Sequence, residues 1–256
     1  MFATQVGAVA QRSLRRTLRQ PANVIPPLVF PVALMAVNAA GLQASTLLPG
    51  FPTDSFLAFA LAVPFIQGAL FSTLNAGTDL ARDIQTGFLN RLSLTPLRGS
   101  ALLAGHLTGV VVLGVAQAVF YISVGLIAGA GFAAGPAGIP VLLAFAALVS
   151  LGFGALGSYF ALRSGSGETV QGLFPVFFVF LFISSMNAPR DLMAVDWFRT
   201  LATLNPVSYL LECVRSLIIT GWDPRALTLG LGVAVAIAAV ALALASRELP
   251  RRMTRT

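Results

Sequence analysis

The sequence predicts an all-α membrane protein with six transmembrane helices. Hydrophobic residues make up 57% of the 256 positions and charged residues only 10%, whereas about 25% of a soluble domain is charged. The mean hydropathy of +0.86 points the same way. A soluble fold of this length has too little interior to bury so much apolar surface. Six apolar runs, each near the ~20 residues that a spanning helix needs, then set the predicted number of helices.

The six runs cover residues 24–42, 56–76, 102–128, 139–162, 170–185 and 227–245. Each is predicted to be a helix, because an open strand edge would leave backbone groups unpaired in lipid. Pro26, Pro27 and Pro31 lie near the start of the first run. Proline is tolerated at a helix N-terminus, where its missing N–H has no partner, and Pro31 predicts a kink.

The basic residues predict the orientation of the chain in the membrane. All 16 are arginines, and those on the side shared by the termini and the second and fourth loops are Arg12, Arg15, Arg16, Arg19, Arg82, Arg91, Arg98, Arg163, Arg247, Arg251, Arg252 and Arg255. The other side holds Arg190, Arg199, Arg215 and Arg225. By the positive-inside rule, this bias predicts a multi-pass protein of the cytoplasmic (inner) membrane with both termini in the cytoplasm. The net charge of +7 could suggest that the chain binds nucleic acid. The arginines flank apolar runs, however, and this placement indicates a protein that interacts with the lipid bilayer.

The N-terminal segment 1–22 has the pattern of a basic amphipathic helix. Val6, Ala10, Leu14 and Leu18 recur every four residues, with arginines on the other faces. This spacing predicts an interfacial helix on the inner leaflet; the alternative is a charge cluster that only directs membrane insertion.

Residues 187–223 mix charged and apolar side chains, which makes the segment too apolar for a free loop and too charged to span. We predict two short outer-face helices there, broken at Asn205–Pro206 and dipping into the outer leaflet as re-entrant helices. The whole chain, 1–256, is interpreted as a single transmembrane domain.

The composition also predicts what this chain does not bind or catalyse. It contains no lysine, and a standard P-loop requires a lysine that reaches the nucleotide phosphates. One cysteine (Cys213) and one histidine (His106) form no metal or nucleophile constellation. We therefore expect no cofactor on this chain and no enzymatic activity of its own, with ATP and Mg²⁺ held by a partner subunit.

The predicted loop after the second span, residues 77–95, has helical periodicity. Its apolar positions Leu80, Ile84, Phe88 and Leu92 recur every four residues, and Asp79, Arg82 and Asp83 are expected to face solvent. Gly87 interrupts the pattern, and Pro96 forces Thr95 out of helical geometry. Periodicity alone favours an ordinary amphipathic connector.

Two stretches carry a resemblance to a known family. The run from Asp83 through Gly87 to Thr95–Pro96, followed by Leu102-Leu-Ala-Gly-His106, resembles the cytoplasmic signature of ABC-2 type transporter permeases, with His106 where that family has Lys. The stretch 197–215 resembles the family's outer-face Asn-Pro-x-x-Tyr…Arg element and lies in the same place, before the last span. The order of elements covers essentially the whole chain, and the daunorubicin-resistance branch is the most similar.

The resemblance implies a transmembrane subunit of an ABC exporter for a hydrophobic or amphipathic substrate, such as a drug, lipid or glycolipid. Such a subunit pairs with a second permease subunit, identical or homologous, and each docks on a cytoplasmic ABC ATPase. Segment 77–95 would be the coupling helix, with Asp79, Leu80, Arg82, Asp83, Ile84, Gly87, Phe88 and Leu92 as its contact residues. Its apolar positions would be anchors and its charges would pair with the ATPase.

The resemblance also implies that Asn205, Pro206, Tyr209, Glu212 and Arg215 form an outer gate or exit. Because Glu212 and Arg215 are three residues apart on one helix face, the alternative is a structural ion pair.

Few polar residues lie inside the predicted spans. Asn38, Gln67, Asn75, Gln117 and Tyr121 are candidates for a substrate path, although such residues also bond neighbouring helices. The expected absence of buried Asp, Glu or Arg argues against a proton-coupled carrier. A membrane assembly or regulatory subunit that transports nothing is the alternative function, and a membrane-embedded enzyme ranks below both.

Overall fold

The computed structural model describes residues 2–93 and 99–253, and the side chains of Asn90, Leu92, Ser93 and Met253 lie outside the description. All regular secondary structure among these residues is helical, and they contain no strand. The first half comprises α1 (Phe2–Leu18), α2 (Pro21–Leu42), η1 (Gln43–Leu47), α3 (Phe56–Ala60), α4 (Ala62–Gln85), α5 (Phe88–Ser93) and α6 (Gly99–Ile127). The second half comprises α7 (Gly138–Ser164), α8 (Gly167–Gly172), α9 (Phe174–Phe182), η2 (Arg190–Leu192), α10 (Asp196–Leu204), α11 (Pro206–Arg215), the π-helical turn η3 (Ser216–Thr220) and α12 (Pro224–Met253).

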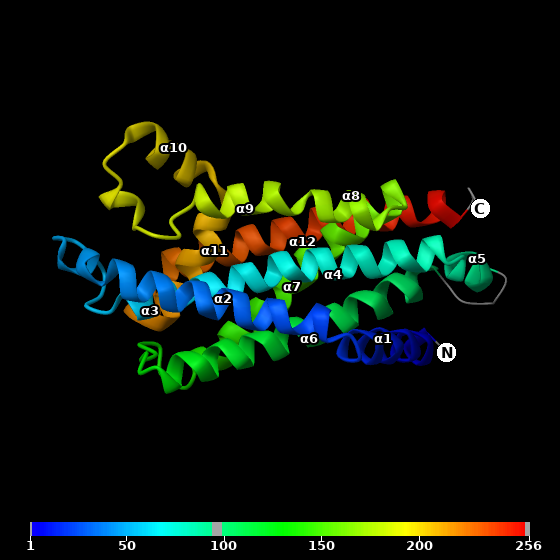
Figure 1. Ribbon diagram of the computed structural model, residues 1–256, viewed down its shortest axis with the longest axis horizontal. Coiled ribbons are helices and arrows are strands. Elements are labelled where there is room, and N and C mark those ends of the chain that lie inside the picture. The colour runs from blue at the N-terminus through cyan, green and yellow to red at the C-terminus, as the bar shows by residue number, and fades with distance from the viewer. Residues whose placement is uncertain (1, 94–98, 254–256) are drawn as a thin grey trace.

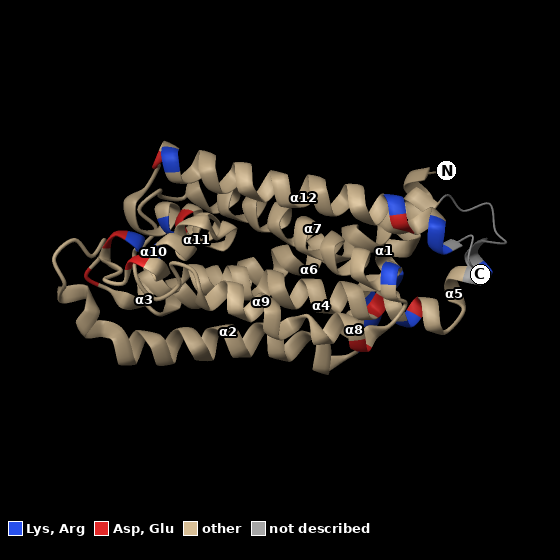
Figure 2. Cartoon of the chain, turned by 90° about the horizontal axis from the view of Figure 1, so that it is seen from above, with Lys and Arg blue, Asp and Glu red and all other residues tan. Residues whose placement is uncertain are grey.

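The long helices form an elongated bundle with two different ends (Figure 1). We call the end that holds α1, α5 and the C-terminal part of α12 the proximal end, and the end that holds η1, α10, α11 and the start of α12 the distal end. Charged residues gather near these two ends, and the middle of the bundle is almost free of them (Figure 2). This separation is the one expected of a chain that crosses a bilayer.

Among the described residues, five helical stretches are long and apolar enough to cross a membrane: Pro21–Leu47, Phe56–Gln85, Gly99–Ile127, Gly138–Ser164 and Pro224–Arg252. These five correspond to five of the six predicted runs, so the chain is a multi-pass membrane protein. The remaining run, 170–185, corresponds to the shorter apolar stretch Gly167–Phe182. This stretch consists of α8 and α9, and its roughly 24 Å of helix is shorter than the ~30 Å hydrocarbon core.

Helix α4 lies at the centre of the bundle and packs most closely against α7. A Cβ atom placed on Gly157 of α7 would lie 2.0 Å from the carbonyl oxygen of Thr73 in α4. The two backbones therefore touch directly, as small residues allow in membrane helices. Replacing this glycine with any other residue would force the two central helices apart.

The boundary of α4 corrects the predicted layout of segment 77–95. The second span does not end at residue 76, because α4 continues as one helix to Gln85. Gly87 then adopts a left-handed conformation with φ +68°, as glycine does without steric cost, and the short α5 follows. The predicted coupling helix is thus the last part of α4 plus α5, and Thr95 and Pro96 lie outside the described residues.

Candidate functional site

An ionic cluster joins α1 to the C-terminal part of α4 at the proximal end. The Asp83 carboxylate accepts hydrogen bonds from Arg12 at 2.9 and 3.0 Å and from Arg16 at 2.7 Å. The second acid, Asp79, is 3.7 Å from Nε of Arg16 and accepts a long 3.4 Å hydrogen bond from the Thr17 hydroxyl. We call these residues (Arg12, Arg16, Asp79 and Asp83) the α1–α4 cluster.

Two further contacts tie the α1–α4 cluster to its neighbours. The Arg12 guanidinium lies 3.7 Å from the centroid of the Phe88 ring at the start of α5. His106 of α6 is buried, and its Nε2 lies 3.1 Å from the carbonyl oxygen of Ala76. The sequence reasoning did not find this cluster, although each helix carries its pair at i, i+4 spacing, which places both members on one face.

The residues of the predicted coupling helix are less exposed than the sequence led us to expect. Asp79 and Asp83 pair with arginines of the same chain, and Leu80 and Ile84 are buried in its own core. Because Leu80 and Ile84 pack in one core cluster with residues of α6, α7, α8 and α12, the apolar stripe of α4 faces inward and is not free for a partner. The exposed residues of this segment include Arg82, Gln85, Thr86 and Arg91, while Gly87 and Phe88 are half-buried.

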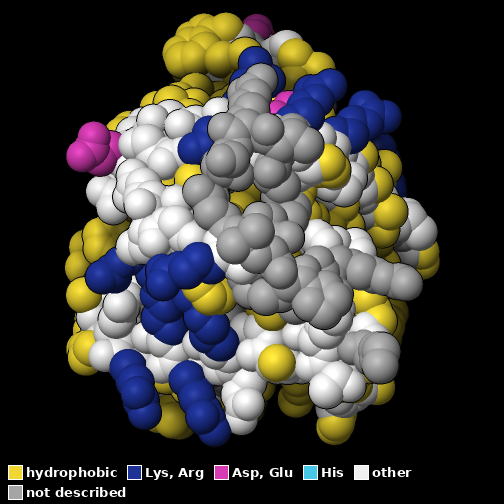
Figure 3. Space-filling view, turned by 90° about the vertical axis from the view of Figure 1, so that its right-hand side faces the viewer, with side chains coloured by type: hydrophobic (Ala, Val, Ile, Leu, Met, Phe, Trp, Pro, Cys, Tyr) yellow, Lys and Arg dark blue, Asp and Glu magenta, His cyan; other side chains and the backbone are white. Residues whose placement is uncertain are grey.

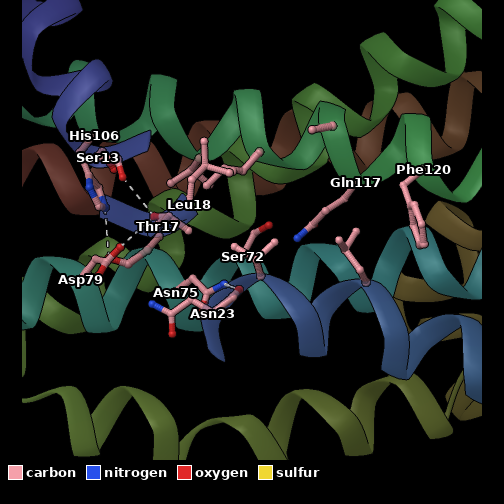
Figure 4. A pocket seen from close by; sticks show the side chains of 16 residues that line it. Ser13, Thr17, Leu18, Asn23, Ser72, Asn75, Asp79, His106, Gln117 and Phe120 are labelled. Atoms are coloured by element: carbon pink, nitrogen blue, oxygen red, sulfur yellow. Dashed lines mark hydrogen bonds between the residues drawn. The ribbon is translucent and has the colours of Figure 1, made fainter. Parts of the chain in front are cut away.

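A cavity of about 250 Å³ opens beside the α1–α4 cluster, between α1, α2, α4 and α6 (Figure 4). Ser13, Thr17, Asn75, Asp79 and His106 line its polar end, and the other end is lined by mostly apolar residues, among them Val24, Leu28, Val110, Leu113, Ala116 and Phe120. The cavity therefore runs from a charged cluster at the proximal end into the apolar interior of the bundle.

Two of the candidate path residues satisfy backbone groups that prolines leave unpaired. Pro27 and Pro31 have no N–H, so the carbonyls four residues earlier, at Asn23 and Pro27, lose their intrahelical donors. Asn75 donates a 3.0 Å hydrogen bond to the Asn23 carbonyl, and the buried Tyr121 hydroxyl donates to the Pro27 carbonyl. Their contacts are those of residues that bond neighbouring helices, although Asn75 also lines the cavity.

The other three path candidates lie in different surroundings. Gln117 lines the cavity, and its side chain points into it (Figure 4). Gln67 is fully buried in α4, and neither of its amide atoms has a hydrogen-bond partner among the described residues. Asn38 is half-buried in α2. The structure thus brings Asn75 and Gln117 to one cavity and leaves Asn38 and Gln67 outside its lining.

The expected absence of buried charge is wrong. Asp79 is 9% exposed and Arg215 is 6% exposed. Asp79 escaped the sequence reasoning because the second span was predicted to end three residues before it, and Arg215 because it lies in a segment predicted to be an outer-face loop with helices. The argument against a proton-coupled carrier from missing buried charges therefore no longer applies.

At the distal end, two helices lie on either side of Asn205–Pro206, as predicted. The Asn205 side chain caps α11 by accepting a 2.9 Å hydrogen bond from the Val207 N–H, and its amide donates to the Ile183 carbonyl at 2.8 Å. Pro206 occupies the first turn of α11, where its missing N–H costs nothing. The Tyr209 hydroxyl donates to the Thr203 carbonyl at 2.8 Å. These contacts fix the corner between α10 and α11.

The predicted Glu212–Arg215 ion pair is wrong, because the two side chains have different partners. Glu212 pairs with Arg190 at 2.6 Å. Arg215 donates to three backbone carbonyls, at 3.0 Å to Phe59, 2.5 Å to Ser185 and 2.6 Å to Met186. Its guanidinium also lies 3.5 Å from the centroid of the Phe59 ring. Burial lowers the pKa of Arg215 to about 9, so the side chain stays protonated at neutral pH.

These side chains surround a polar hollow of about 550 Å³ at the distal end. Three of the predicted gate residues line it, Tyr209, Glu212 and Arg215, together with Arg190, and the other two, Asn205 and Pro206, lie outside it. Further charges come from Asp191, Arg199, Asp223 and Arg225. The hollow is thus a vestibule lined by both signs of charge, which suits a polar surface at an aqueous face.

Comparison with known proteins adds independent evidence. A family model described as ABC-2 type transporter matches residues 4–219. A daunorubicin resistance ABC transporter permease protein from Streptomyces coeruleorubidus is 30% identical over 171 residues, which cover 65% of this chain and 59% of that relative. Putative transport permeases from Porphyra purpurea and Pyropia yezoensis are each 27% identical, over 86% and 83% of this chain and 76% and 73% of their own lengths.

Proposed function

The chain belongs to the ABC-2 type transporter family, as a membrane subunit of an ABC transporter, and from this premise we propose that it is the permease of an exporter. It moves a hydrophobic or amphipathic substrate, such as a drug, lipid or glycolipid, across the cytoplasmic membrane. A separate cytoplasmic ABC ATPase binds and hydrolyses the ATP. The daunorubicin resistance relative supports a role in antibiotic resistance.

One observation supports ATP coupling above the others: α4 is a continuous helix from the bundle core to the proximal end, where it connects through Gly87 to α5. Arg82, Gln85, Thr86 and Arg91 are exposed around this tip. An ATPase that binds the tip differently in its open and closed states would shift the position of α4. The α1–α4 cluster would carry the same movement to α1.

The proposed arrangement in the membrane follows from the two ends of the bundle. The proximal end, with both termini, faces the cytoplasm, and arginines from α1 spread over its face (Figure 3). Helix α1 lies at the inner leaflet, and α8 with α9 forms a sixth, short span. Helices α10 and α11 lie at the outer face as a re-entrant pair whose vestibule is the exit. A second permease subunit, identical or homologous, completes the transporter.

The test uses exposed residues at the proposed docking tip. We expect the wild-type chain, co-expressed with a cytoplasmic ABC ATPase encoded beside it, to purify as a complex that hydrolyses ATP in lipid nanodiscs. The double variant Arg82→Glu/Arg91→Glu reverses two exposed charges at the tip and should lower recovery of the ATPase at least tenfold. Variants at Ile84 are unsuitable, because this side chain is buried in the permease itself.

The matched control is Arg163→Glu/Arg247→Glu, which makes the same charge change at exposed positions of α7 and α12. It should leave ATPase recovery unchanged. If the two double variants behave alike, the docking tip is wrongly assigned. If no ATPase co-purifies with the wild type, the exporter proposal loses its energy source, and an assembly or regulatory subunit becomes the better explanation.

A further inference from the structure

We infer that the cavity between α1, α2, α4 and α6 binds an amphiphile with one hydrocarbon chain and a primary ammonium head group, which enters from the surrounding lipid. The inference that the cavity binds this ligand depends only on the geometry of this chain. The further inference that the ligand is the transported substrate rests on the proposed function.

The shape of the cavity fits a single chain. Drug-sized ligands occupy pockets of about 300–1,000 Å³, so a cavity of about 250 Å³ admits one slender hydrocarbon segment. Ala116 and Phe120 of α6 line it and are also exposed on the outer surface of the bundle, whereas His106 and Val110 at the same helix are buried. The apolar part therefore opens sideways to lipid, beside α6.

The polar end has an acid that is under-coordinated by its own chain. The two carboxylates of the α1–α4 cluster are not equivalent: Asp83 receives three short hydrogen bonds from Arg12 and Arg16, at 2.7–3.0 Å. Among the described residues, Asp79 has only the 3.7 Å contact with Arg16 and the 3.4 Å hydrogen bond from Thr17, and it lines the cavity (Figure 4). A buried carboxylate with two long contacts retains lone pairs for a further strong donor.

The lining of the cavity sets the sign of the ligand head group. The cluster of two arginines and two aspartates is neutral as a whole, but Asp79 is its one member that lines the cavity, while both arginines contact Asp83 more closely. A ligand ammonium in the cavity would therefore meet the Asp79 carboxylate, and Arg16 would keep its 2.7 Å contact with Asp83. An anionic head group would instead meet the Asp79 carboxylate where water is scarce, and such an uncompensated charge is costly.

The test is photolabelling of the purified chain in nanodiscs, without any ATPase. The probes are decylamine and decanol, each carrying the same diazirine near the end of the chain. We expect the amine to label residues 113–120 of α6 at least fivefold more than the alcohol, because Asp79 favours the ammonium. Leu113→Trp, which fills the apolar part, should abolish labelling by both probes.

The decisive variant is Asp79→Asn, which should reduce amine labelling to the level of the alcohol while alcohol labelling persists; the persistence shows that the cavity is still folded. Glu168→Gln makes the same charge change at an exposed position of α8 and should keep the amine preference. Equal labelling by both probes in the wild type, or an amine preference that survives Asp79→Asn, would overturn the inference.

Two further arms identify the source of the head group and separate the inference from the proposed function. Protection by lysophosphatidylethanolamine, which has a single acyl chain, would assign the ammonium to a lipid, and the absence of protection would assign it to a free amine. A chain that binds the amine but transports nothing with its ATPase would contradict the exporter proposal alone. A chain that transports without any amine preference would contradict the site alone.

Discussion

The two ends of the molecule hold buried charge in different ways. At the proximal end, Asp79 and Asp83 of α4 are neutralised by side chains of another helix, Arg12 and Arg16 of α1. At the distal end, Arg215 has no carboxylate within salt-bridge distance among the described residues, and three backbone carbonyls hold it instead.

The two kinds of partner, side chains at the proximal end and backbone carbonyls at the distal end, allow different movements. Side chains at the end of a flexible stem can exchange partners without moving the backbone, so α1 can separate from α4 or accept a ligand between them. The carbonyls of Phe59, Ser185 and Met186 belong to the backbone, so they can leave Arg215 only if the backbone itself moves. We therefore infer that the distal charge is a permanent brace between α3, α11 and the segment after α9, and that the proximal cluster is a contact that can open.

The largest expected effect comes from breaking the distal brace. Arg215→Met keeps an unbranched apolar stem but leaves three buried carbonyls without donors, and each unsatisfied group costs about 1–3 kcal/mol, about 3–9 kcal/mol for all three. Because Arg215 lines the vestibule, where water can reach, we expect a loss in the lower half of this range, roughly 3–5 kcal/mol, which in a chain of this size lowers the thermal midpoint by roughly 6–20 °C. The measurement is thermal unfolding of the purified chain in detergent or nanodiscs.

Arg225→Met is the control, because Arg225 is an exposed arginine on the wall of the same vestibule. Its midpoint should change by no more than about 2 °C, as surface changes cost little. Equal shifts for both variants would mean that the three carbonyl contacts of Arg215 do not stabilise the fold.

The sequence was sufficient for features that depend on local pattern. Apolar runs of about 20 residues predicted all ends of the five long helices to within nine residues, and seven of the ten ends to within three. Asn205–Pro206 predicted the break between α10 and α11. Gly87 was predicted to interrupt its helix, and its left-handed conformation shows why. Each of these depends on residues close together in the chain.

Features that depend on how helices pack could not be predicted in this way. The residues of the α1–α4 cluster are 67–71 positions apart where they hydrogen bond, and nothing local selects Arg190 over Arg215 as the partner of Glu212. The prolines at the start of the first run predicted a kink, but not that Asn75 and Tyr121 would donate to the carbonyls that Pro27 and Pro31 leave unpaired. The rotation and register of each helix decide these pairs.

An intermediate effect is expected from opening the proximal cluster. Asp83→Asn removes the negative charge and one of the two acceptor oxygens that Arg12 and Arg16 use, so α1 should hold to α4 less tightly by about 1–2 kcal/mol. The reporter is Ala10→Cys on α1, where the native side chain is 6% exposed. Its maleimide labelling should accelerate roughly tenfold, since about 1.4 kcal/mol changes an equilibrium tenfold. Cys213, the one native cysteine, is 1% exposed and adds little background.

Asp191→Asn serves as the matched control, because it makes the same change at an exposed distal position and should not alter labelling at position 10. Unchanged labelling in Asp83→Asn would show that apolar packing of α1 on α6, and not the ionic contacts, holds this helix in place.

The smallest expected effect comes from breaking the Arg190–Glu212 pair. It tests whether a charged contact is fixed because its partners are backbone carbonyls or because it lies at the distal end. Arg190 and Glu212 form a 2.6 Å ion pair at the distal end, yet their side chains are 22% and 26% exposed, and Arg190 also lies 4.6 Å from the Tyr209 ring centroid. This pair is thus a side-chain contact on the same side of the molecule as the Arg215 brace. Arg190→Gln should cost about 1 kcal/mol or less, because water can solvate the released Glu212.

The measurement is again the thermal midpoint, taken at low and high salt. The shift caused by Arg190→Gln should be at most a third of that caused by Arg215→Met, and it should shrink in about 1 M salt, where the Debye length falls to about 3 Å. A double-mutant cycle with Glu212→Gln isolates the pair from the ring contact. If Arg190→Gln instead destabilises the chain as much as Arg215→Met, and salt has no effect, then position at the distal end matters more than the type of partner. The contrast between a fixed brace and an exchangeable ionic contact would then fail.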